Sequence, residues 1–130
     1  MTPQEKAQLF VDLCARYPYG IIVKLDNDKI LCVKEINFSN GDYFLTLNSE
    51  DKRYIGIDVE RIRPFLRPIS SMTEEEKLEY KSTFYTYEDE LGTKVSYPTY
   101  LSTDWLIAHH FDFRGLIKLN LALEATKEMY

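Results

Sequence analysis

Apolar residues near the start of the chain recur at three- and four-residue spacing, the pattern of one face of an α-helix. This stripe consists of Leu9, Phe10, Leu13, Cys14 and Tyr17, while Glu5, Lys6, Asp12 and Arg16 fall on other faces. Thr2, followed by Pro3 and then Glu5, is a helix-start signal, because threonine caps the first turn and glutamate completes a capping box. A helix is therefore predicted from Pro3 to about Arg16, packed on the sheet that follows.

Four short apolar runs come next, at residues 21–25, 29–38, 43–47 and 53–58, separated by turn-forming residues. Asn40-Gly41 is a strong hairpin signal, because both residues tolerate the left-handed conformation that a tight turn needs. Consecutive runs are therefore predicted to pair as a small antiparallel β-meander. A fifth strand over 63–68 should lie at an edge, because it carries two prolines. This order of elements resembles a small SH3-like barrel.

Helical signals return in the second half of the chain. Thr73 and Glu76 fit a second capping box, so a helix is predicted from Thr73 to about Tyr87. Its expected buried positions are Leu78, Phe84 and Tyr85. The three glutamates at 74–76 lie near the positive end of the helix dipole, where negative charge is favourable. We interpret them as a helix start, since consecutive side chains on a helix diverge.

The last third of the chain is predicted to add one more helix and a packed tail. Residues 95–100 around Pro98 should be extended, and Ser102 or Thr103 should cap a helix that ends by about 112–115. The apolar segment 116–123 is expected to pack back on the domain. The whole pattern predicts an α+β fold in a single domain, 1–130, with a helix and meander in 1–68 and a helical part in 69–130.

The segment between these halves has its own signal. Arg63-Pro64 and Arg67-Pro68 bracket Phe65 and Leu66, and each proline restricts the residue before it to an extended conformation. The segment should therefore be a rigid connection, with Phe65 and Leu66 buried between the meander and the C-terminal helices.

Composition narrows the class of protein. Of the 130 residues 45% are hydrophobic and 28% charged, which is typical of a folded chain with a real core. The net charge of −5 opposes nucleic-acid binding. Cys14 and Cys32 have no spacing that indicates a disulfide framework, a zinc site or a redox motif. No apolar run approaches the ~18 residues needed to cross a bilayer, so we expect a cytoplasmic protein with no membrane contact. We also expect no cofactor.

One stretch has the residue types of a catalytic or metal site. His109, His110 and Asp112 are competent metal ligands, and Arg114 follows at once, so a metal-dependent hydrolase is one hypothesis. Adjacent side chains on a helix point about 100° apart, so both histidines can face one ion only if the helix ends between them. The alternative is that one histidine caps the last helical turn while Asp112 and Arg114 pair to fix the turn at Gly115.

A second candidate surface is basic and aromatic. Its members are Tyr54, Arg61, Arg63, Phe65 and Arg67, with Lys52 and Arg53 nearby in the sequence. Small barrels bind single-stranded nucleic acid with such surfaces. The alternative is that these arginines protect an edge strand from unwanted pairing.

Three segments carry a resemblance to a known group of proteins. The runs 65–75 and 110–117, with the closing residues 121–125 and 129–130, resemble short uncharacterised proteins encoded by gut Bacteroides and their phages or mobile elements. Glycine is frequent in that family where this chain has Asn120, and proline where it has Thr126. Asparagine also tolerates a left-handed helix end. The family has no assigned activity, so the resemblance implies no catalytic residue.

The function most consistent with these patterns is a non-enzymatic one. Ten tyrosines and an aromatic content of 14% favour a domain that binds another protein or itself, since tyrosine supplies large contact area with a polar tip. The same tyrosines also fit a small core. The metal-dependent hydrolase and the single-strand nucleic-acid binder stay open as alternatives.

Overall fold

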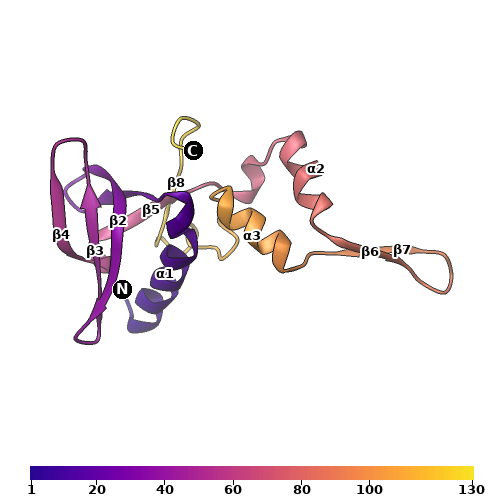
Figure 1. The fold of residues 1–130 in the computed structure, drawn as a ribbon, viewed down its shortest axis with the longest axis horizontal. Helices are drawn as coiled ribbons and strands as arrows, with labels where there is room; N and C mark the ends of the chain where they lie inside the picture. Colours follow the sequence, from indigo (N-terminus) through magenta and orange to yellow (C-terminus); the bar gives the residue numbers. More distant parts are fainter.

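The computed structural model describes all 130 residues and divides them between a sheet-based body and a part that projects from it (Figure 1). The body contains α1 (Pro3–Arg16), β1 (Ile22–Leu25), β2 (Ile30–Ser39), β3 (Asp42–Asn48), β4 (Arg53–Asp58), β5 (Ile62–Leu66) and β8 (Leu123–Glu124). The projecting part, residues 74–108, contains α2 (Glu74–Ser82), β6 (Tyr85–Glu88), β7 (Lys94–Tyr97) and α3 (Tyr100–Ala108). The predicted α+β class is therefore confirmed. No helix is long and apolar enough to cross a membrane.

The N-terminal helix begins where its sequence predicts. The Thr2 hydroxyl accepts the Glu5 backbone N–H, and the Glu5 carboxylate accepts the Thr2 N–H, which completes the capping box. Leu9 and Leu13 are buried against the sheet, but Cys14 is exposed. Asp12 and Arg16 are fully buried although their positions suggested solvent.

The meander is confirmed, and the barrel is not. Strands β1 to β4 pair consecutively and antiparallel, in a six-stranded sheet of order β4-β3-β2-β1-β5-β8. The outermost strands are β4 and β8, which do not pair with each other, so the sheet stays open. Strand β8 comes from the C-terminal half and pairs parallel with β5.

Strand β5 has a neighbour on each side, yet it accepts Pro64. It pairs antiparallel with β1 along Ile62–Pro64 and parallel with β8 only at Phe65 and Leu66. Pro64 therefore has no strand partner on the β8 side, where its missing N–H costs no ladder bond. The prediction of an edge strand is correct for this half of β5 and wrong for the other half.

The main core includes residues from both ends of the chain. Its fifteen members are Leu9, Leu13, Ile21, Val23, Leu25, Leu31, Leu45, Leu47, Ile57, Val59, Ile62, Leu66, Leu116, Leu121 and Ala122. The last three confirm that the apolar C-terminal segment packs back on the body. Asn120 has a φ of 61°, so it takes the left-handed conformation expected at this turn.

The projecting part differs from its prediction beyond the end of α2. Helix α2 begins at the predicted capping box but ends at Ser82, and Tyr85 opens a strand. Leu78 is 72% exposed and Tyr85 is 53% exposed, so neither is a buried helix position. The reason is a local turn: the Asp89 carboxylate accepts the Leu91 and Thr93 N–H groups, which closes a β6–β7 hairpin.

A second, smaller cluster holds the projecting part together at its base. Met72, Leu106 and Phe111 are buried in it, with Tyr80, Trp105 and Phe113 packed around them. Helix α3 begins at Tyr100, capped by Thr99, three or four residues earlier than the predicted cap at Ser102 or Thr103.

Candidate functional site

The β6–β7 hairpin extends away from the body, beyond α2 and α3 (Figure 1). Its cross-strand pairs are Tyr85↔Tyr97, Thr86↔Ser96, Tyr87↔Val95 and Glu88↔Lys94. Side chains alternate between the faces of a hairpin, so the aromatic residues share one face and the polar residues share the other. We call the set Tyr85, Tyr87, Val95 and Tyr97 the tyrosine face.

The tyrosine face is a contiguous aromatic surface. Ring centroids of Tyr85 lie 5.4 Å from Tyr97 and 6.0 Å from Tyr87, and Tyr87 lies 6.3 Å from Tyr97. The three rings are 44–53% exposed, because no other element packs on them. Leu91 at the hairpin tip is 91% exposed. Apolar groups clustered in this way are typical of a contact surface.

Hydrogen bonds at the base fix the hairpin to its helices. The Thr83 hydroxyl lies 2.8 Å from the Ser102 hydroxyl, and the Thr99 hydroxyl donates to the Thr83 carbonyl at 3.1 Å. The indole N–H of Trp105 donates to Glu79 at 3.0 Å, joining α3 to α2. These contacts orient the tyrosine face relative to α2 and α3.

The residues of the proposed hydrolase site do not converge. His109 stacks on Trp105 at 4.1 Å, whereas His110 stacks on Tyr130 at 3.6 Å. The Asp112 carboxylate accepts the backbone N–H groups of Leu116 and Ile117, so it caps the following turn. No group of three histidine, cysteine, aspartate or glutamate side chains is placed to share a metal ion.

The two histidines instead end helix α3. The His110 N–H donates to the Ile107 carbonyl and the Phe111 N–H donates to the Leu106 carbonyl, which is a Schellman motif. His110 occupies the left-handed position with a φ of 65°, where glycine is usual. The helix thus ends at the histidines through backbone hydrogen bonds, and no histidine side chain caps its last carbonyl groups.

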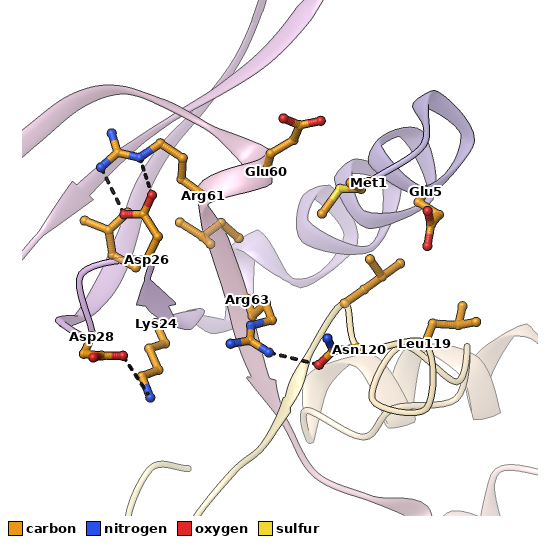
Figure 2. A pocket seen from close by; sticks show the side chains of 13 residues that line it. Met1, Glu5, Lys24, Asp26, Asp28, Glu60, Arg61, Arg63, Leu119 and Asn120 are labelled. Carbon is orange, nitrogen blue, oxygen red and sulfur yellow. Dashed lines mark hydrogen bonds and ion pairs between the residues drawn. The ribbon is translucent and has the colours of Figure 1, made fainter.

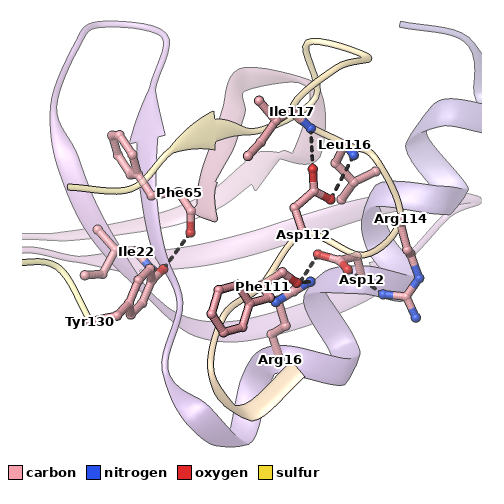
Figure 3. A network of polar contacts seen from close by, with 10 residues as sticks. All are labelled: Asp12, Arg16, Ile22, Phe65, Phe111, Asp112, Arg114, Leu116, Ile117 and Tyr130. Carbon is pink, nitrogen blue, oxygen red and sulfur yellow. Dashed lines mark hydrogen bonds and ion pairs between the residues drawn. The ribbon is translucent and has the colours of Figure 1, made fainter. Parts of the chain in front are cut away.

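Tyr130 joins this turn to the sheet. Its hydroxyl accepts the Ile22 N–H at 3.0 Å and donates to the Phe65 carbonyl at 2.9 Å, bridging β1 and β5 just beyond the Val23↔Pro64 pair (Figure 3). Burial raises the pKa of the Tyr130 phenol. His110, stacked on the same ring, is 9% exposed, and its Nδ1 makes no hydrogen bond to the protein.

His110 should make the stability of the fold pH-dependent. Burial, assisted by the charge of Arg16, lowers the pKa of His110 from 6.5 to about 4. Between these values the unfolded chain binds a proton that the folded chain does not, so stability falls as pH falls from 6.5 to about 4. We expect a loss of roughly 3 kcal/mol over this window, measured by urea unfolding.

The control for this prediction is His110→Asn, because asparagine tolerates the left-handed conformation and does not titrate. It should flatten the stability profile between pH 6.5 and 4. The variant should keep the separate loss of stability between pH 4.5 and 2 that comes from Glu76. A hydrogen bond from Arg67 lowers the pKa of Glu76 to about 2. An unchanged slope in the upper window would contradict the assignment to His110.

Arg114 pairs with a distant residue instead of Asp112. The Asp12 carboxylate contacts Arg114 and also accepts the Arg16 Nε–H at 2.8 Å. All three side chains lie where α1 meets the segment after α3 (Figure 3). The Arg16 Nη2 also donates to the Phe111 carbonyl at 2.6 Å. The predicted Asp112–Arg114 pair is therefore wrong.

The basic and aromatic candidate surface is not assembled. Arg61 pairs with Asp26, Arg63 with the Asn120 amide and Arg67 with Glu76. Phe65 is 7% exposed and so is not part of a surface. Tyr54 lies on β4, at the opposite edge of the sheet, where the Lys29 ammonium donates to its hydroxyl and lowers the pKa of that phenol.

Two of these arginines line a hollow of about 510 Å³ beside the open edge of β5 (Figure 2). Its polar lining is Glu5, Lys24, Asp26, Asp28, Glu60, Arg61, Arg63 and Asn120. Charges of opposite sign pair with one another there, as Lys24 does with Asp28 at 3.4 Å. The hollow therefore lacks a set of free polar groups that converge on one ligand.

Comparisons with protein-family models, curated protein sequences and solved structures find no significant match. The resemblance to Bacteroides and phage proteins stays a prediction. The tyrosine face was also missed by the sequence analysis, although a signal was present. Tyr85-Thr86-Tyr87 and Val95-Ser96-Tyr97 alternate with period two around the turn at Asp89, which is the pattern of a hairpin.

Proposed function

We propose that this chain is a non-enzymatic binding protein that recognises a protein partner through the tyrosine face. The observation that carries the proposal is the clustering of three half-exposed tyrosines on one side of a projecting hairpin. Tyrosine is enriched in protein interfaces because it contributes a large apolar area, a hydroxyl group and little side-chain entropy. The remaining candidate residues support this choice, because they pair with their own neighbours or are buried.

The hairpin is also suited to contact on geometric grounds. Strands β6 and β7 form a two-stranded sheet of their own, so the outer edge of each strand has unpaired backbone groups. A partner segment in extended conformation can pair with such an edge while its side chains lie on the tyrosine face. Main-chain bonds would then supply affinity and the aromatic rings specificity.

The double variant Tyr85→Ser/Tyr97→Ser tests the proposal. Both rings are about half exposed, so the variant should fold with stability within about 1 kcal/mol of the wild type. It should lose binding to any partner at least tenfold, measured by calorimetry on the purified pair, since interface aromatic residues are energetic hot spots. Thr86→Ala/Ser96→Ala, on the opposite face of the same two strands, is the matched control and should bind normally.

The wild type and the same two variants also serve to test whether the chain binds a second copy of itself. Sedimentation velocity of the wild type and both variants measures it directly. Partner binding that is equal in the tyrosine variant and the control would overturn the proposed function.

A further inference from the structure

The net charge of the protein lies entirely in the projecting part. Residues 74–108 contain eight acidic and three basic side chains, a net charge of −5, whereas the remaining residues contain 13 of each. The body is therefore neutral overall, and the part that presents the tyrosine face is strongly acidic.

Half of these eight carboxylates are available to a partner. Lys77 pairs with Glu74 and Arg67 with Glu76, but Glu75, Glu88, Glu90 and Asp104 are exposed and make no ion pair. Glu88 lies on the hairpin itself, opposite Lys94, and Glu90 lies in the turn at its tip. The hairpin that presents the tyrosine face therefore carries acidic side chains on its opposite face and at its tip.

We infer that the partner is a basic protein segment, in which lysine or arginine alternates with apolar side chains. This inference rests on the proposed function and adds the chemistry of the partner. Apolar side chains of such a segment would contact the tyrosine face, and its basic side chains would lie near Glu88 and Glu90. Complementary charge raises the association rate and excludes acidic competitors.

A second copy of this chain fits the surface less well, because two projecting parts in contact would each bring a net charge of −5. A nucleic acid would meet the same repulsion.

The inference is tested by selecting, from a library of random 12-residue peptides, those that bind the immobilised full chain. Peptides that bind the Tyr85→Ser/Tyr97→Ser variant are removed from the library first. We expect the selected peptides to be enriched in lysine and arginine at alternate positions. Synthetic versions should bind about tenfold more weakly when salt is raised from 50 to 500 mM. The charge reversal Glu88→Lys/Glu90→Lys should weaken binding to a similar extent, and Glu50→Lys/Asp51→Lys on the body is its matched control.

The outcomes separate the two proposals. Selected peptides that need the tyrosines but are neutral or acidic would overturn the basic partner and leave the proposed function standing. Binding that no tyrosine substitution weakens, or no selected peptide at all, would count against both. A tyrosine-dependent dimer in sedimentation experiments would replace the basic partner with a second copy.

Discussion

Asp12→Ala is expected to destabilise the protein by about 3–5 kcal/mol. Asp12 is fully buried and is the only carboxylate that contacts Arg16 and Arg114. Removing it leaves the Arg16 guanidinium, also fully buried, with no counter-charge. Breaking a buried ion pair from one side is costly, because the remaining charge has lost its hydration and its partner.

Urea unfolding at pH 7 measures this loss, with Asp28→Asn as the control, because asparagine tolerates the φ of 70° at this position. Asp28 also pairs with a basic residue four positions away, Lys24, but its side chain is 86% exposed, so loss of its charge should cost at most about 1 kcal/mol. Asp12→Leu/Arg16→Met should recover much of the stability, because well-packed apolar residues often replace a buried pair without cost. An Asp12→Ala variant within 1 kcal/mol of the wild type would contradict the role of this network.

This network connects the body to the projecting part. Arg16 on α1 donates to the Phe111 carbonyl, and Phe111 belongs to the small cluster at the base of α2 and α3. The guanidinium of Arg67 also lies 4.2 Å from the Phe111 ring centre, and the Arg67 backbone exchanges hydrogen bonds with His110 and Asp112. The position of the hairpin relative to the sheet therefore depends on contacts around Phe111.

Elements with local signals were predicted well. The capping boxes at Thr2 and Thr73 each satisfy their own first turn, so four residues are enough to identify them. The Asn40-Gly41 turn likewise fixes its hairpin from two residues. The predicted helix at Thr73 was too long because its start signal is strong and Leu78, Phe84 and Tyr85 were expected to be its buried positions.

Features that depend on distant contacts were missed. Asp12 and Arg16 have the spacing of an exposed helical pair, and only Arg114 and the Phe111 carbonyl, about a hundred residues later, explain their burial. Strand β8 is two residues long and is defined by its parallel pairing with β5, which its short sequence does not indicate. The candidate arginines looked like one strip because the sequence does not show that Asp26, Asn120 and Glu76 meet them.

Phe65→Ala is the second substitution expected to have a large effect, at about 3–5 kcal/mol. The sequence predicts Phe65 between the two halves, and the structure buries it, 7% exposed, on β5 opposite Leu123 of β8. It lies outside both apolar clusters, so the connection to the projecting part runs through Leu66, Arg67 and Phe111 instead. Loss of the ring should still weaken the β5–β8 pairing. It should also weaken the packing of Tyr130, whose hydroxyl donates to the Phe65 carbonyl.

The measurement is urea unfolding followed by tryptophan fluorescence and by far-ultraviolet circular dichroism. Trp105 lies on α3, so its fluorescence reports on the projecting part, whereas the circular dichroism signal reports on the whole chain. Because Arg67 joins β5 to the His110–Asp112 segment by two backbone hydrogen bonds, the two signals should change together in the wild type, and Phe65→Ala should lower both midpoints equally. Glu75 is exposed in the first turn of α2, so Glu75→Ala should lower the free energy of unfolding by at most about 1 kcal/mol. A fluorescence midpoint that stays fixed while the circular dichroism midpoint falls would show that the projecting part unfolds independently of the sheet.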